Sequence, residues 1–81
     1  MVSLIEQLAK AEGMTPERIR GVGRPRDVSR VRDGTAYLWV EYLGGSGRAL
    51  ARELGLRPES VNRAARRGQE QAEYWHKILK I

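Results

Sequence analysis

Residues 47–66 read GRALARELGLRPESVNRAAR, and the spacing of their apolar residues predicts two short helices joined by a tight turn. The inner face of the first helix is formed by Leu50, Ala51 and Leu54, at spacings of one and four from Leu50. Gly55 can adopt the positive φ that ends a helix, and Pro58 suits the first turn of the next one. We therefore expect a helical hairpin over residues 47–67, with Ser46 as the cap of its first helix.

The second helix of this hairpin combines an inner apolar face with an outer polar row. The inner residues are Val61, Ala64 and Ala65, and the outer row comprises Arg57, Glu59, Asn62, Arg63, Arg66 and Arg67. Packing requires the inner face but not the outer row. The stretch therefore favours a helix-turn-helix that enters the major groove of DNA, and a generic packing hairpin is the alternative.

Length and composition limit what the chain can be. Its 81 residues predict one small domain, 1–81, and its net charge of +5 comes mostly from arginine, which binds phosphate and guanine edges in a bidentate manner. The absence of cysteine fits a reducing cytoplasm. No apolar run approaches about 18 residues, and the N-terminal sequence lacks a signal-peptide pattern, so we expect a cytoplasmic, nucleoid-associated protein without membrane contact.

Helices are also expected before the hairpin. Capping and stop residues predict one from Ser3 to Gly13 and a short one that begins at Thr15 and Pro16. A longer helix should begin at Asp27. Its apolar stripe comprises Val28, Val31, Thr35, Ala36, Leu38, Trp39, Tyr42 and Leu43. A glycine at position 34 costs about 1 kcal/mol relative to alanine in a helix, but the apolar period passes through it unshifted, so one helix is expected.

The segment GMTPERI, residues 13–19, resembles GLRPESV, residues 55–61. A second helix-turn-helix is one interpretation of this similarity. However, Glu12 stands where the later segment has the apolar Leu54, and no long helix is predicted to follow. We interpret the similarity as a shared pattern for starting a helix.

Residues 20–26, RGVGRPR, form a basic loop whose glycines and proline disfavour regular structure. It is either an exposed linker or an arm that places arginines in a minor groove. The residues expected at the DNA backbone or minor groove are Arg20, Arg24, Arg26, Arg30, Arg32, Arg48, Arg52 and Arg67. The residues expected at base edges are Arg57, Glu59, Asn62, Arg63 and Arg66.

The tail predicts a final helix over residues 69–80. Its apolar residues, Ala72, Trp75, Ile78 and Leu79, could close the core or pair two copies of the chain, with Trp75 and Leu79 at the homodimer face. His76 is the only histidine, so no metal site is expected.

This order of elements resembles the C-terminal DNA-binding domain of the bacterial replication initiator DnaA, and the related domain that ends REP-associated tyrosine transposases. The resemblance rests on LIEQLAKAEGMTPERIRG (4–21), RPRDVSRVR (24–32), AYLWVEYLG (36–44) and the hairpin, whose LGLRPESVNRAARRG (54–68) is closer to the transposase version. It implies that Arg24 and Arg26 reach a minor groove and that residues 57–66 read a major groove. The chain departs from the initiator family's Asp-His-Thr-Thr, with Arg-Pro-Glu-Ser at 57–60, and has no counterpart of the transposase's catalytic domain.

Together these patterns predict an all-α fold, a small bundle of five to six helices that contains a helix-turn-helix, similar to the DnaA C-terminal domain or to Trp repressor. The expected function is sequence-preferring binding of double-stranded DNA, as an accessory domain of a transposase-like or initiator-like protein, with no cofactor and no small-molecule substrate. No nucleophile, base and orienting group come together in the sequence, so we expect no enzyme. The alternative is a helical protein-interaction or dimerisation module without specific DNA binding.

Overall fold

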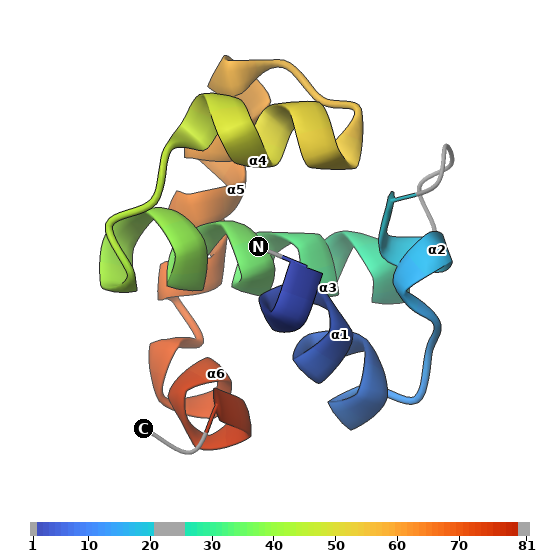
Figure 1. Cartoon of the computed structure of the whole chain (residues 1–81). Helices are drawn as coiled ribbons and strands as arrows, with labels where there is room; N and C mark the ends of the chain where they lie inside the picture. The colour runs from blue at the N-terminus through green and yellow to red at the C-terminus, as the bar shows by residue number, and fades with distance from the viewer. Residues whose placement is uncertain (1, 21–25, 80–81) are drawn as a thin grey trace.

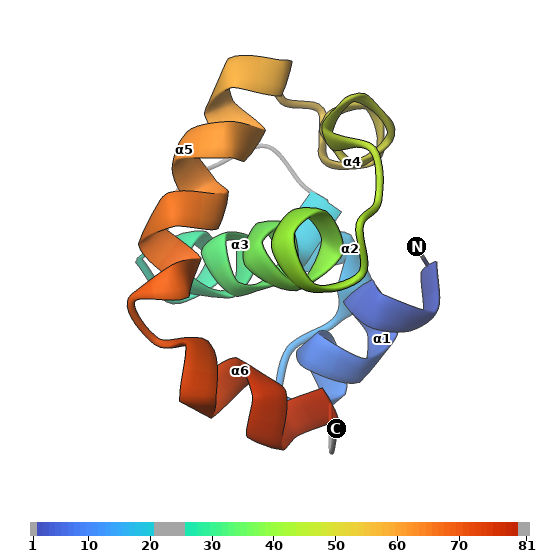
Figure 2. The ribbon, with the colours of Figure 1, turned by 90° about the vertical axis from the view of Figure 1, so that its left-hand side faces the viewer.

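One long helix runs through the centre of the molecule, and the other helices pack around it (Figures 1 and 2). In the computed structural model, which describes residues 2–20 and 26–79, this helix consists of α3 (Arg26–Ala36) and the π-helical segment η1 (Tyr37–Tyr42) that follows directly. The remaining elements are α1 (Val2–Ala11), α2 (Pro16–Arg20), α4 (Gly47–Leu54), α5 (Pro58–Gln69) and α6 (Ala72–Leu79). The described residues contain no strand, and the predicted all-α bundle is confirmed.

The helix passes through Gly34 as predicted, and the packing explains why a glycine stands there. A Cβ atom added to Gly34 would lie 2.4 Å from the ring of Trp75, closer than two unbonded carbons can approach. The missing side chain therefore lets the buried indole of α6 lie directly on α3. The cost of glycine within a helix is offset by this close contact.

Gly68 allows a second close approach, between α5 and α3. The predicted end of the hairpin is wrong at this residue. We expected the tail helix to begin at residue 69, but α5 continues to Gln69 and α6 begins only at Ala72. A Cβ at Gly68 would lie 2.1 Å from the backbone oxygen of Asp33. The glycine is thus used inside α5, where that helix crosses α3, rather than as its stop.

The apolar stripe of the central helix is confirmed as far as Trp39, which packs partly buried against the core, and is wrong for Tyr42 and Leu43. Val28, Val31 and Leu38 are buried, whereas Tyr42 is 44% and Leu43 is 50% exposed. The cause is the π-helical turn, in which the amide of Leu43 donates to the carbonyl of Leu38 at 2.8 Å, five residues back. A wider turn rotates the later residues away from the face that an α-helix would present to the core.

The first helix begins at Val2, ahead of the predicted cap Ser3, and its end agrees with prediction because Gly13 has a φ of +69°. Its apolar face belongs to a single core that all helices share. The core comprises Leu4, Ile5, Leu8, Ala9, Ile19, Val31, Ala36, Leu38, Leu50, Ala51, Leu54, Val61, Ala64, Ala65 and Trp75. No helix in the described ranges is both long and apolar enough to span a membrane.

The tail helix α6 closes this core. Trp75 has no exposed surface, and Ile78 and Leu79 are partly buried against the same cluster. Trp75 was one of the two residues that suggested a dimer face, and its indole is used within its own chain. The homodimer stays a prediction, but the buried Trp75 no longer supports it.

Candidate nucleic-acid interface

The helical hairpin predicted over residues 47–67 forms as α4, a turn and α5. The Ser46 hydroxyl caps α4 by accepting a hydrogen bond from the amide of Ala49 at 3.3 Å, as expected. Gly55 ends α4 with a φ of +67°, and the amide of Leu56 donates to the carbonyl of Ala51 at 2.8 Å. Both bonds satisfy backbone groups that a helix end leaves open, so the bend is fixed locally.

The two sides of α5 separate as the sequence predicts. The inner residues Val61, Ala64 and Ala65 are buried against α3 and α4, while the outer residues are exposed. The exposed set is Arg57, Glu59, Asn62, Arg63, Arg66 and Arg67. Figure 2 shows α5 along one side of the molecule, with no other helix outside it.

Of the four arginines outside the hairpin whose side chains are described, three form ion pairs with acidic residues. Arg18 Nη2 lies 3.4 Å from Asp27 Oδ2, and Arg20 Nε lies 3.1 Å from Glu53 Oε1. Arg30 forms an ion pair with Glu12. Two of the residues predicted to contact DNA, Arg20 and Arg30, are therefore already engaged by carboxylates.

The position of Arg32 contradicts its predicted contact with the DNA backbone. It is only 7% exposed, and its Nε donates to the backbone oxygen of Ile19 at 2.7 Å. The guanidinium satisfies a carbonyl at the end of α2, where a helix leaves its last carbonyls without intrahelical donors. A group buried in this way is not available to a DNA phosphate.

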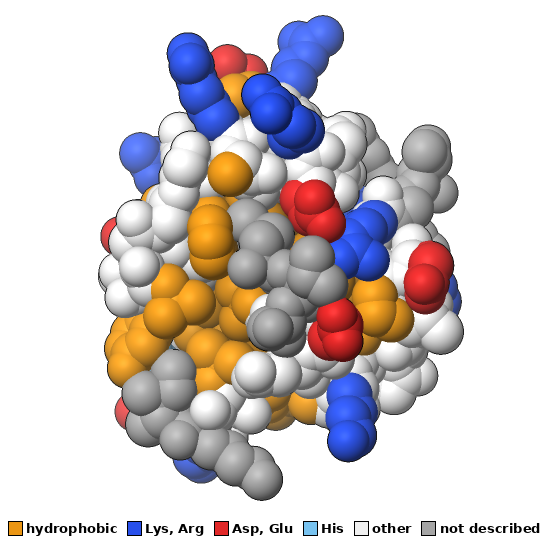
Figure 3. All heavy atoms as spheres, in the orientation of Figure 1, with side chains coloured by type: hydrophobic (Ala, Val, Ile, Leu, Met, Phe, Trp, Pro, Cys, Tyr) orange, Lys and Arg blue, Asp and Glu red, His pale blue; other side chains and the backbone are white. Residues whose placement is uncertain are grey.

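The arginines of α4 and α5 behave differently, because only one of them is paired. Within residues 4–20 and 27–79, no carboxylate forms an ion pair with Arg48, Arg52, Arg57, Arg63 or Arg66. All five are exposed. Figure 3 shows basic side chains projecting from the end of the molecule where α4 and the start of α5 lie. Unpaired positive charge thus gathers on the hairpin.

The outer surface of α5 consists of two parallel stripes. Glu59, Asn62 and Arg66 follow one another at three and four residues, and so do Ser60, Arg63 and Arg67. The second stripe faces α3, because its three residues line a cavity together with residues of that helix. The three residues of the first stripe are exposed and do not line this cavity. The sequence analysis placed Arg63 and Arg67 in the same outer row as the first stripe.

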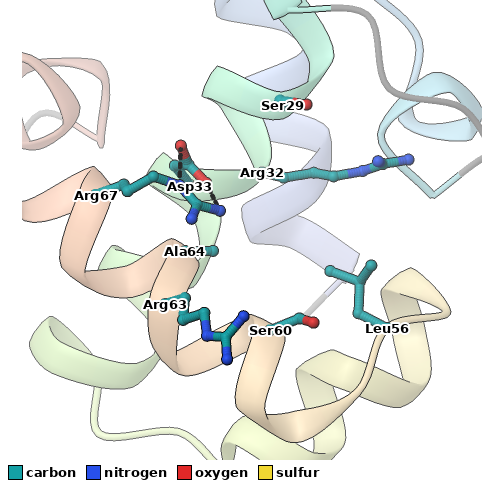
Figure 4. Close-up of a pocket in the computed structure, with 8 residues that line it drawn as sticks. All are labelled: Ser29, Arg32, Asp33, Leu56, Ser60, Arg63, Ala64 and Arg67. Carbon is teal, nitrogen blue, oxygen red and sulfur yellow. Dashed lines mark hydrogen bonds and ion pairs between the residues drawn. The ribbon is translucent and has the colours of Figure 1, made fainter.

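The cavity between α3 and α5 has a volume of about 190 Å³ (Figure 4). Its lining comprises Ser29, Arg32, Asp33, Leu56, Ser60, Arg63, Ala64 and Arg67. Arg67 is held there by Asp33, whose carboxylate accepts from Nε and Nη2 at 3.1 to 3.2 Å. Sequence reasoning missed Ser29, Asp33 and Ser60, since only the crossing of the two helices brings them together.

A second polar cluster lies where the turn after α1 meets α3 and α6. The Tyr74 hydroxyl donates to Glu12 Oε2 at 2.5 Å, and the Arg30 guanidinium stands 5.3 Å from the Tyr74 ring centroid and 5.2 Å from that of Trp75. The hydrogen bond to Glu12 raises the pKa of Tyr74 above its ordinary value of 10.0, and the small burial of the phenol adds to this. Arg30 therefore joins three helices of the core, not the hairpin surface.

Arg20 and Arg26, the two ends of the predicted basic loop, are the last residue of α2 and the first residue of α3. Residues 21–25, which include Arg24, lie outside the described residues, and of Arg26 only the backbone at the start of α3 is described.

In the described ranges, no group of three histidine or acidic side chains is arranged to hold a metal ion. Comparison of the chain with protein-family models, curated proteins and solved structures gave no match.

Proposed function

We propose that this chain binds double-stranded DNA with a sequence preference, and that the α4–α5 hairpin is the binding element. The observation that carries the proposal is the distribution of unpaired arginines. Elsewhere in the described chain arginines are paired or buried, whereas five exposed arginines of the hairpin have no acidic partner. None of these five guanidinium groups forms an ion pair within the part of the chain that the structure describes, so ion pairing within the fold does not account for them.

Unpaired arginines suit a polyanion for a simple electrostatic reason. A paired arginine would have to leave its carboxylate before it could contact a phosphate, whereas an unpaired one offers its full charge. Each phosphate that is neutralised also releases counterions from the DNA, which makes the affinity depend steeply on salt. Arg48 and Arg52 on α4 are proposed to contact phosphates, which position the protein without reading the sequence.

Base reading is assigned to the stripe of α5 that faces solvent. Arginine pairs well with guanine, asparagine with adenine, and glutamate accepts a hydrogen bond from cytosine. Arg66, Asn62 and Glu59 offer these three groups on one side of one helix. Arg57 precedes the first turn of α5, at the end of a recognition helix that commonly meets base edges.

The resemblance to the DnaA C-terminal domain and to its transposase-associated version is part of this proposal. The short turn with Gly55 between α4 and α5 supports it, because a glycine turn between two helices is the usual build of a helix-turn-helix. On this reading the protein is a nucleoid-associated accessory domain without cofactor or catalysis. The altered sequence at residues 57–60 predicts a DNA site different from the initiator's own.

Selection of binding sites from random duplex DNA, at two salt concentrations, tests the proposal. We expect enrichment of a short motif at both, with weaker retention at the higher salt. Retention without a motif would indicate electrostatic binding alone. No retention at either concentration would refute the proposal in favour of the protein-interaction alternative, for which the exposed Tyr42 and Leu43 offer an apolar surface.

A further inference from the structure

We propose that the cavity between α3 and α5 seats one phosphodiester of the DNA backbone. The inference rests on the proposed DNA binding and assigns a role to the second stripe of α5. Ser60, Arg63 and Arg67 contribute from α5, and Ser29 contributes from the first turns of α3 (Figure 4).

The charges and hydroxyls around the cavity suit an anion. Arg67 and Asp33 form a bidentate pair, so the aspartate's charge is already offset within the wall. Arg63 has no carboxylate partner in the described chain and leaves the lining with an excess of positive charge. The Ser29 and Ser60 hydroxyls add donors on the two facing helices. Arg32 also lines the cavity, but Figure 4 shows its guanidinium extending toward α2, where it donates to Ile19.

The apolar part of the lining distinguishes a diester from a free phosphate. Leu56 and Ala64 lie beside the polar groups. A free phosphate ion is charged on every side and gains nothing from such contacts, whereas a backbone phosphate carries sugar carbons on its ester oxygens. The volume of about 190 Å³, against roughly 30 Å³ for one water in the liquid, has room for a group of this size.

The cavity lies where one strand of the DNA backbone would run if α5 occupied the major groove. The major groove is about 12 Å wide, and a helix with its side chains is about 10–12 Å across, so a helix lying in the groove meets phosphates along its flanks. The stripe with Glu59, Asn62 and Arg66 points into the groove in this arrangement. The stripe with Arg63 and Arg67 then borders one strand, and α3 covers that strand from the outside.

The inference changes the expected role of Arg63 from a base contact to a phosphate contact. A phosphate contact weakens binding to all duplexes alike, while a base contact weakens binding to the preferred site alone. Arg63 and Arg66 are both exposed arginines of the same helix, three residues apart. They form a matched pair for the test.

The experiment compares Arg63→Ala and Arg66→Ala in the full chain, on the selected duplex and on a scrambled duplex, over a series of salt concentrations. Arg63→Ala should reduce both affinities by the same factor, about tenfold, and lower the salt slope by about one unit. Arg66→Ala should reduce only the affinity for the selected site. The double variant Ser29→Ala and Ser60→Ala should act like Arg63→Ala in a weaker form, and circular dichroism would confirm that each variant folds.

Chemical modification of the duplex identifies which DNA phosphate the cavity holds. Replacing single phosphates of the selected duplex by uncharged methylphosphonates should reveal one position that weakens the wild type but has no further effect on Arg63→Ala. A loss for Arg63→Ala on the selected duplex alone would overturn the inference while DNA binding stands. Saturable, Arg63-dependent binding of inorganic phosphate at matched ionic strength, with duplex binding unaffected by the variants, would overturn it in favour of a free phosphate ligand. Absence of duplex binding by the wild type would overturn both proposals.

Discussion

The turn between α1 and α2 and the turn between α4 and α5 have nearly the same geometry and very different surroundings. Gly13 and Gly55 have φ angles of +69° and +67°, and each is followed by an amide that donates to a carbonyl five residues back, at 2.9 and 2.8 Å. A proline starts the next helix in both. The shared sequence pattern thus encodes a shared turn.

The two hairpins differ in length and in how their charges are used. The helix after the first turn has 5 residues, and the helix after the second has 12. Both arginines of α2 pair with carboxylates, and Glu12, at the position equivalent to Leu54, pairs with Arg30. The charged residues of the first hairpin hold the fold together through ion pairs, whereas five arginines of the second have no carboxylate partner in the described chain. A local turn pattern therefore predicts structure, and the unpaired side chains beyond it indicate function.

The largest expected effect comes from exchanging the two equivalent positions. Leu54→Glu places a carboxylate at a site that is 3% exposed, and should lower the free energy of unfolding by more than about 4 kcal/mol. Glu12→Leu removes a carboxylate that is 7% exposed and is bonded to Arg30 and Tyr74, but the Arg30 side chain stays 44% exposed to solvent, so the loss should be smaller, about 1–3 kcal/mol. Urea denaturation measures both, with Leu54→Ala as an intermediate at about 2–5 kcal/mol. Equal losses at the two positions would contradict the distinction between the hairpins.

The next effect concerns DNA affinity. Changing Arg48, Arg52 and Arg63 together to alanine should lower the salt slope by about three units, since three proposed phosphate contacts are lost. The matched control replaces Lys10, Arg18 and Lys77, which are exposed and lie outside the hairpin, and removes the same net charge. Fluorescence anisotropy with a labelled duplex follows both variants. Similar losses in the two would mean that net charge, not the hairpin, governs binding.

Gly13 and Gly55 allow the stability of the two turns to be compared directly. Alanine at position 13 or 55 would have to adopt a left-handed conformation, which costs about 1–2 kcal/mol for an L-residue. Neither site has an atom within 4 Å of an added Cβ, so no steric term should separate them. Thermal denaturation should therefore show similar decreases for Gly13→Ala and Gly55→Ala. A clear difference would indicate that the turns are not equivalent.

The smallest effect is the titration of Tyr74. The hydrogen bond to Glu12 raises the pKa of Tyr74 above 10.0, so the folded chain holds this proton more tightly than the unfolded chain does. The resulting stability is complete below pH 10 and is lost as the pH rises through the folded pKa. Glu12→Gln should lower the Tyr74 pKa toward its ordinary value, which the NMR shift of its ring carbons would report. An unchanged Tyr74 pKa in this variant would contradict the hydrogen bond to Glu12 as the cause of the shift.

The sequence predicted well what local rules decide. The Ser46 cap, the Gly55 turn, the buried face of α4 and the exposed row of α5 follow from helix periodicity and from the preferences of single residues. These features depend on neighbours within a few residues along the chain. Local patterns are sufficient for them.

One error came from a local irregularity, the π-helical turn, and the others came from contacts between distant segments. The π-helical turn at 37–42 shifts the helix face, so Tyr42 and Leu43 are exposed instead of buried. Arg32 turns inward because the end of α2 presents the carbonyl of Ile19 to it. Gly68 is used for the crossing with Asp33, and Arg67 pairs with the same aspartate. No sequence rule links positions that far apart until the helices are packed.

Titration of the isotope-labelled chain with the selected duplex, followed by the NMR shifts of its backbone amides, tests the central proposal most directly. We expect the largest shift changes at residues 57–66, with smaller changes at Arg48, Arg52 and Ser29, and none of that size in α2 or α6. Changes centred on Tyr42 and Leu43, or none that saturate with added duplex, would contradict the assignment of the α4–α5 hairpin as the DNA-binding surface.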